Sequence, residues 1–241
     1  MKRTEVINGI IKHHGFKSYL EIGVYDMKNF NAIECESKVG VDPNVEGENI
    51  FTQTSSEYLC DSVRGYDCVF IDGDHTYAQS HEDLYSCLMR LNDNGLILLH
   101  DTNPNNIKEI TPNNNGKAWC GEVWKTVLDA KFDGYKIQTI PDDYGLTIIT
   151  GEKEELKEKQ TLPTPQEFLK NKSSLLNFIS YNDYIKSRDE PKEVLKDTTD
   201  IQIDDINDMT DEELKDFYKA VYGKKPKGRF IREKVIDRLI N

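Results

Sequence analysis

The chain lacks the features that mark membrane, secreted and cysteine-bridged proteins. None of its apolar runs approaches the roughly 18 residues of a membrane span, and residues 1–8 lack the apolar stretch of a signal peptide. Five cysteines are scattered without Cys-x-x-Cys spacing. This pattern argues against a cysteine-built zinc site and favours reduced, packed thiols. We therefore expect a cytoplasmic protein with no membrane partner.

Positive charge is also scarce. The 241 residues carry a net charge of −12, which argues against a protein that coats nucleic acid with its whole surface. The charge is uneven: residues 209–241 hold nine basic and six acidic side chains, so the residues before them carry −15. Residues 187–208 are acidic and non-periodic. They predict a linker between a domain over residues 1–186 and a small two-helix module over residues 209–241.

Strand-like and helix-like segments alternate along the first 150 residues. Expected strands are 18–22, 39–42, 49–52, 66–72, 94–101, 135–140 and 146–150, and expected helices are 2–14, 55–61, 76–91, 119–130 and 166–186. The last two strands are joined by Pro-Asp-Asp-Tyr-Gly, as in a hairpin. This order predicts an α/β fold with a Rossmann-like, doubly wound, mostly parallel seven-stranded sheet and a terminal antiparallel hairpin.

Two of the buried strands stop at acidic and imidazole side chains. One continues into Asp72-Gly73-Asp74-His75 and the other ends in His100-Asp101. Ligands of open α/β sheets bind outside the carboxyl ends of the strands, and adjacent strands lie about 4.8 Å apart. Asp72 and Asp101 are therefore predicted to converge on one cation or one polar substrate. The alternative is that each caps the helix that follows.

The first two strands end in a possible nucleoside site. Gly23 would let a ligand approach the backbone, and Asp42 could accept hydrogen bonds from both ribose hydroxyls. The alternative is a turn and a capping aspartate. Residues 24–28 contain no further glycine, which disfavours a dinucleotide because its pyrophosphate needs a glycine-rich loop. S-adenosylmethionine has no phosphates and is compatible with this loop.

Four motifs between residues 15 and 150 now carry a specific resemblance. They are Tyr-Leu-Glu-Ile-Gly-Val, Val-Gly-Val-Asp-Pro, Val-Phe-Ile-Asp-Gly-Asp-His-Thr-Tyr and Gly-Leu-Ile-Leu-Leu-His-Asp-Thr. Their order and spacing resemble class I S-adenosylmethionine-dependent methyltransferases. Within that class they are most similar to small-molecule O-methyltransferases such as the macrocin- and mycinamicin-type sugar enzymes. The family often has a second glycine four residues after the first, where this chain has Met27.

The resemblance implies a cofactor and a metal ion. S-adenosylmethionine would contact Glu21, Gly23, Val24, Asp42, Ser55 and Asp72. A divalent cation, Mg²⁺ or another, would be held by Asp72 and Asp101, with His100 as a third ligand or as a structural hydrogen-bond donor. Mg²⁺ prefers oxygen ligands and keeps several waters. Ser55 lies in the run 54–57, which could line the adenine pocket or cap a helix.

His75 is the predicted general base. It lies three residues after Asp72, and its free pKa near 6.5 suits proton removal at neutral pH. A structural histidine is the alternative. Trp119 could wall the substrate side, and Trp124 is expected in the core.

The leading hypothesis is metal-assisted O-methylation of a small hydroxylated substrate, such as a sugar or related diol. A second is a nucleic-acid-directed methyltransferase or binding protein that docks through residues 209–241. This segment resembles short helix–extended–helix modules, and related modules bind nucleic acid or proteins. Its cluster 224–229 could contact phosphates, and the alternative is a solvated turn. The core lacks an Asn/Asp-Pro-Pro-Tyr/Phe motif and is acidic, which disfavours that reading. A third is a non-catalytic or metal-binding relative that kept only the fold. An oligomer is compatible with the sequence.

Overall fold

The computed structural model describes residues 1–114, 118–155, 160–189, 210 and 214. The chain folds into two compact units, Met1–Ile185 and Lys186–Asn241. The predicted linker and two-helix module lie outside the described residues, apart from residues 187–189, 210 and 214. The fold below is that of the first unit.

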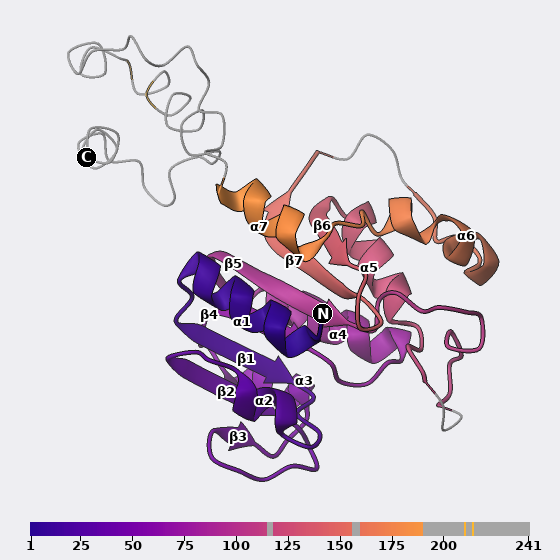
Figure 1. The fold of residues 1–241 in the computed structure, drawn as a ribbon. Coiled ribbons are helices and arrows are strands. Elements are labelled where there is room, and N and C mark those ends of the chain that lie inside the picture. The colour runs from indigo at the N-terminus through magenta and orange to yellow at the C-terminus, as the bar shows by residue number, and fades with distance from the viewer. Residues whose placement is uncertain (115–117, 156–159, 190–209, 211–213, 215–241) are drawn as a thin grey trace. The chain divides into compact units, whose positions relative to one another are not determined.

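A seven-stranded sheet forms the centre of this unit, in the order β3-β2-β1-β4-β5-β7-β6 (Figure 1). The strands are β1 (Ser18–Ile22), β2 (Ser37–Val41), β3 (Ile50–Phe51), β4 (Tyr66–Ile71), β5 (Leu91–His100), β6 (Tyr135–Ile140) and β7 (Leu146–Lys153). The first five are parallel, and β7 runs antiparallel to both β5 and β6. The predicted Rossmann-like sheet with a terminal hairpin is confirmed.

The strand register brings the carboxyl ends of the central strands level with one another. Ile22 of β1 pairs with Ile71 of β4, and Ile71 pairs with Leu99 of β5. The residues that follow these three strands therefore emerge side by side at one edge of the sheet. This edge is called the carboxyl edge below, and the opposite edge the amino edge.

Helices cover both faces of the sheet, as the near-continuous apolar runs of the central strands require. Helices α1 (Arg3–His14), α2 (Lys28–Ala32) and α7 (Tyr181–Asp189) pack on one face, and α3 (Ser55–Asp61), α4 (Tyr77–Leu88), α5 (Val123–Phe132) and α6 (Pro165–Leu175) on the other. In the described part of the chain, no helix is long and apolar enough to cross a membrane.

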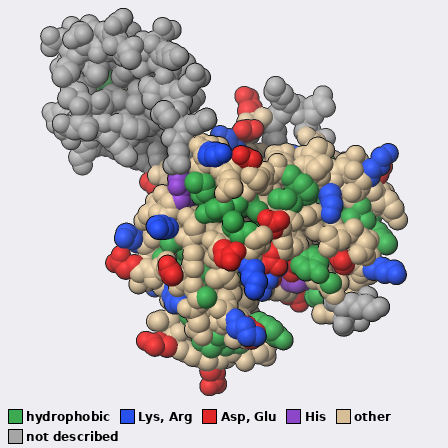
Figure 2. Space-filling view, in the orientation of Figure 1, with side chains coloured by type: hydrophobic (Ala, Val, Ile, Leu, Met, Phe, Trp, Pro, Cys, Tyr) green, Lys and Arg blue, Asp and Glu red, His purple; other side chains and the backbone are tan. Residues whose placement is uncertain are grey.

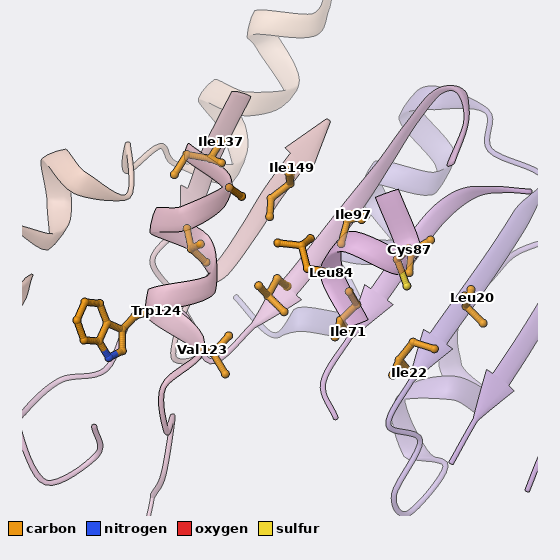
Figure 3. Close-up of a cluster of buried hydrophobic side chains, with 14 of the residues drawn as sticks. Leu20, Ile22, Ile71, Leu84, Cys87, Ile97, Val123, Trp124, Ile137 and Ile149 are labelled. Carbon is orange, nitrogen blue, oxygen red and sulfur yellow. The ribbon is translucent and has the colours of Figure 1, made fainter. Parts of the chain in front are cut away.

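Alternation along the strands sends neighbouring side chains into two separate cores. Leu20 and Ile22 of β1 join Leu84 of α4 in one core (Figure 3), whereas Tyr19 packs with α1 on the other face. Trp124 is fully buried and stacks on Phe168 at 4.3 Å between ring centroids, so its predicted core position is confirmed.

The structure corrects the predicted helix over residues 166–186. Two helices replace it: α6 packs in one core and α7 in the other. Residues 176–180 cross the β6 side of the sheet between them, where Asn177 has a φ of 50° and Ile179 donates its amide to the Thr139 carbonyl at 3.0 Å. Neither glycine nor proline marks the break, so the amphipathic pattern is continuous in the sequence.

Candidate active site

Asp72 and Asp101 converge at the carboxyl edge, just after β4 and at the end of β5. Together with His75 they offer one ligand atom each, and these atoms all lie within 4.8 Å of one another. His75 Nε2 is 3.6 Å from Asp72 Oδ1 and 3.2 Å from Asp101 Oδ2. Two carboxylates and one imidazole therefore meet around a single point.

His75 is held by its other ring nitrogen. Nδ1 lies 2.9 Å from the carbonyl oxygen of Trp119. A carbonyl can only accept, so Nδ1 carries the proton and Nε2 faces the carboxylates. Burial lowers the pKa of His75, but Asp72, Asp101 and the Trp119 carbonyl outweigh it, and the pKa is raised above its usual value. The Trp119 ring lies against His75, 4.9 Å between centroids.

His100 contacts both carboxylates through one ring nitrogen. It is 3% exposed, and its Nδ1 lies 3.2 Å from Asp72 Oδ1 and 3.3 Å from Asp101 Oδ2. Nε2 lies 2.8 Å from the carbonyl oxygen of Asp143. Burial lowers the pKa of His100, but Asp101 and Asp72 reverse the effect and raise it to about 10. Both nitrogens then donate, and the role of His100 as a metal ligand stays a prediction.

Arg3 is a site residue that the sequence analysis missed. Its Nη1 lies 3.4 Å from Asp72 Oδ2 and 3.3 Å from each ring nitrogen of His100. Burial raises the pKa of Asp72, but the two histidines and Arg3 outweigh it and hold the pKa well below its usual range. Asp72 is therefore ionised in this setting. No local motif marks Arg3, because α1 brings it to β4 from a distant part of the sequence.

Asp101 occupies a strained backbone position. Its φ is 57°, a left-handed value that is uncommon for residues other than glycine. Asp101 Oδ1 accepts the thiol of Cys120 at 3.6 Å, while Oδ2 faces the two histidines. Strain of this kind clusters at functional sites, where the surrounding contacts maintain it.

Asp42 closes the loop that follows β1. Its Oδ2 accepts the amides of Val24 at 3.1 Å and Tyr25 at 3.0 Å, and its Oδ1 accepts the amide of Asn44 at 2.8 Å. An ionised carboxylate offers about four lone-pair sites. Three are used within the chain, so about one is left on Oδ1 for a ligand hydroxyl. Asp42 thus acts as the predicted cap and keeps capacity for one ribose hydroxyl.

Gly23 is required by the contact between the ends of β1 and β4. Its φ is +83°, and a Cβ atom would lie 2.2 Å from the Asp72 carbonyl oxygen. Met27, four residues later, also has a positive φ of 61°. The loop thus has a left-handed residue at the position where the sequence resemblance predicts a glycine, and the methionine adopts the strained conformation.

Glu21 is buried beside this loop with 1% exposure. Its Oε2 accepts the hydroxyl of Tyr19 at 2.6 Å and the side-chain amide of Asn29 at 3.0 Å. Burial raises the pKa of Glu21 to about 7, and these two hydrogen bonds oppose the shift. Its predicted cofactor contact stays a prediction.

The segment at the start of α3 combines a helix cap with a polar cluster. Thr54 accepts the amide of Glu57 at 3.2 Å, and Glu57 accepts the amide of Thr54 at 2.9 Å, which is a capping box. Ser55 donates its hydroxyl to Asp83 Oδ1 at 2.5 Å, and Gln79 donates to the same oxygen at 2.9 Å. The cap is therefore present, while contact of Ser55 with a cofactor stays a prediction.

Known proteins share this fold. Residues 31–102 match a family model described as a methyltransferase domain. The S-adenosylhomocysteine-bound methyltransferase PaMTH1 of Podospora anserina is similar at 16% identity and a TM-score of 0.51, over 64% of this chain and 78% of that one. A putative caffeoyl-CoA O-methyltransferase of Staphylococcus aureus matches at 22% identity and a TM-score of 0.49, over 63% and 85% of the two chains. No curated protein matches.

A third structure is the methyltransferase MycE of the mycinamycin biosynthetic pathway, solved with Mg and S-adenosylhomocysteine. It matches at 14% identity and a TM-score of 0.43, over 65% of this chain and 51% of that one. At such identities the likeness to PaMTH1 shows the fold alone. The chain has the fold of these methyltransferases, and one part of it, residues 31–102, matches a methyltransferase domain.

Proposed function

We propose that this protein transfers the methyl group of S-adenosylmethionine to a hydroxyl oxygen of a small acceptor, such as a sugar or related diol. The observation that carries the proposal is the orientation of His75. Its Nδ1 is committed to the Trp119 carbonyl, so Nε2 is the ring nitrogen that faces the strand-end carboxylates, and it offers a lone pair when His75 is unprotonated. A base in this position can serve an acceptor hydroxyl at the carboxyl edge, where α/β sheets bind their ligands.

The proton and the methyl group move in opposite directions in this reaction. His75 Nε2 takes the proton of the acceptor hydroxyl while the oxygen attacks the methyl carbon. The sulfonium bond breaks, and S-adenosylhomocysteine leaves with the electron pair on sulfur. The imidazolium that forms is stabilised by Asp101 and Asp72, which lie 3.2 Å and 3.6 Å from Nε2. Much of the rate would come from holding oxygen and methyl carbon in line.

The cofactor would lie across the end of β1. Asp42 has capacity for about one ribose hydroxyl beyond its three backbone amides. Gly23 and Val24 would present the backbone to the methionine portion, with Glu21 below them. Ser55 would approach the adenine from the start of α3. Asp72 would contribute through its position beside Gly23, whose φ permits the close approach of these two strand ends.

The carboxylate pair also fits a divalent cation, Mg²⁺ or another. Asp72 and Asp101 would hold it, and a bound cation would lower the pKa of the acceptor hydroxyl. His75 could supply a third ligand, because its Nε2 belongs to the same cluster. Ligation and proton transfer compete for that one lone pair. We assign it to proton transfer, since two carboxylate oxygens and waters satisfy the preference of Mg²⁺ for oxygen.

Calorimetry separates these roles. We expect S-adenosylhomocysteine to bind the wild-type protein, and Mg²⁺ to bind with an affinity that His75→Ala leaves within about threefold. His81→Ala, on the partly exposed side of α4, is the matched histidine control. Loss of Mg²⁺ binding in His75→Ala would make His75 a ligand instead of the base. Absence of S-adenosylhomocysteine binding to the wild type would overturn the proposed function itself.

The face of the described residues shown in Figure 2 gives the nucleic-acid alternative no support, because its lysine and arginine side chains lie among acidic ones. The basic cluster at residues 224–229 lies outside the described residues. Its role toward a nucleic-acid or protein partner stays a prediction, as does the division at residues 186 and 208.

A further inference from the structure

We propose that the segment Trp119–Glu122 positions two side chains of the carboxyl edge, His75 and Asp101, together, with Gly121 and Cys120 as its decisive residues. The inference deepens the proposed function and, in its kinetic part, rests on it. These residues are positioning residues, because they act through His75 and Asp101 and not on the reacting atoms.

The segment holds His75 at its ring and at its backbone. The Trp119 carbonyl accepts from Nδ1 at 2.9 Å, and the amide of Glu122 donates to the His75 carbonyl at 2.8 Å. The Trp119 ring also lies against the imidazole. Rotation of the ring would break the Nδ1 hydrogen bond, so the direction of Nε2 is set by this segment.

Gly121 makes this contact possible. Its φ is +59°, and a Cβ atom would lie 2.3 Å from the His75 carbonyl oxygen and 2.7 Å from its Cβ. These atoms belong to the backbone and the base of a side chain, which cannot swing away. Any side chain at this position would therefore push the 119–122 segment away from His75.

Cys120 of the same segment contacts Asp101. The thiol is fully buried and reaches Asp101 Oδ1 at 3.6 Å. A thiol is a weak donor, but its contact with Oδ1 leaves Oδ2 as the oxygen that faces His75 Nε2. Asp101 also has a left-handed backbone, a strained conformation that surrounding contacts must maintain.

The segment is itself anchored. The amides of Cys120 and Gly121 both donate to the Glu109 carbonyl at 3.0 Å. The Glu109 side chain, 8% exposed, accepts the amide of Asn105 at 2.7 Å and the side-chain amide of Asn106 at 2.8 Å. These bonds explain why the predicted helix at 119–130 begins only at Val123. The backbone groups of residues 119–122 form hydrogen bonds with Glu109 and His75 instead of with a helix.

Gly121→Ala is the first test, with Gly15→Ala as its control. Gly15 has a similar φ of +66°, but nothing lies within 4 Å of its Cβ position, so this variant carries the strain without the clash. In Gly121→Ala we expect loss of the slowly exchanging Nδ1–H signal of His75 in ¹⁵N–¹H spectra. We also expect a fall in kcat of about 10²-fold, the scale for a displacement near 1 Å. S-adenosylhomocysteine affinity should stay within about twofold, and Gly15→Ala should keep the signal and kcat.

Cys120 gives a second test that survives if Gly121→Ala fails to fold. Cys120→Ser keeps a donor and should retain kcat within about threefold, whereas Cys120→Ala should lose about tenfold or more. Cys87→Ala is the matched control, because Cys87 is equally buried but lies on α4 and packs in the core. An unchanged His75 signal in a folded Gly121→Ala protein, or equal kcat in Cys120→Ala and Cys87→Ala, would overturn the inference. Failure of the wild type to bind S-adenosylhomocysteine would instead count against the proposed function, because the His75 signal is read without cofactor.

Discussion

The aspartates at the two edges of the sheet have different partners, although one lies near the start of β4 and the other follows its end. Asp67 lies at the amino edge, near the start of β4. It accepts the amides of Lys17 at 2.8 Å and Ser18 at 3.0 Å and the side-chain amide of Asn92 at 2.7 Å. Asp72 follows β4 at the carboxyl edge, where its partners are two imidazoles and the Arg3 guanidinium.

Backbone strain follows the same division. Among the described non-glycine residues with positive φ, five lie at the carboxyl edge or in the turn beside it: Tyr25, Met27, Asp101, Asp143 and Tyr144. The amino edge ties strands together through neutral donors, which favours stability. The carboxyl edge keeps charges close together on a strained backbone, an arrangement that favours function over stability. Substitutions at the two edges should therefore affect different measurements.

The largest effect should come from the carboxyl edge. His75→Ala should lower turnover by about 10²–10⁴-fold, the range for loss of a general base. The acidic limb of the pH–rate profile should disappear with it, because the wild-type rate rises as His75 loses its proton. Steady-state kinetics over a pH series measure both effects. Near-normal turnover with an intact limb would remove His75 from catalysis.

Asp42→Ala should weaken S-adenosylhomocysteine binding by about 1–3 kcal/mol, since a ribose hydroxyl loses a charged acceptor and the amides of Val24 and Tyr25 lose theirs. Titration calorimetry measures the change. Asp67→Ala provides the control for loss of a carboxylate at the other edge and should leave the affinity unaltered. Equal affinity in the Asp42 variant would restrict this residue to its capping role.

Asp67→Ala should instead lower the free energy of unfolding by about 1–2 kcal/mol at pH 7. Burial raises the pKa of Asp67, but the hydrogen bonds from Asn92, Lys17 and Ser18 outweigh it and leave the pKa lowered. A lowered folded-state pKa stabilises the protein above the unfolded value near 3.9, and this contribution is lost as the pH falls through the folded-state pKa. Urea unfolding should therefore show the gap between variant and wild type narrowing below about pH 4. A gap independent of pH would show that the carboxylate charge plays no part.

Met27→Gly should have the smallest effect. Glycine removes the left-handed strain, worth about 1–2 kcal/mol, but it also removes a side chain whose Cε lies 2.9 Å from a Cβ position built at Gly47. It adds freedom to the unfolded chain as well. The net change in unfolding free energy should stay within about 1 kcal/mol. A gain above that value would mean that the strain at this loop dominates, and a large loss would mean that packing does.

Local patterns in the sequence determined the fold and the position of the site. The apolar runs that end at Ile22, Ile71 and Leu99 define parallel strands, and the order of strands and helices defines the sheet. Because parallel strands end at one edge, the convergence of Asp72 and Asp101 followed from the same runs. The helix-capping signal at Thr54 and Glu57 was equally local, and the structure contains it.

Tertiary structure alone decided which groups surround the two acids. Arg3 belongs to α1, and the Trp119 carbonyl and the Cys120 thiol belong to the segment before α5. The short helix α2 and the break between α6 and α7 likewise lack a local signal. Backbone carbonyls and amides carry no residue identity, and contacts between distant segments depend on how helices pack on the sheet. The sequence could therefore point to His75 as a base, but only the packed chain sets the direction of its ring.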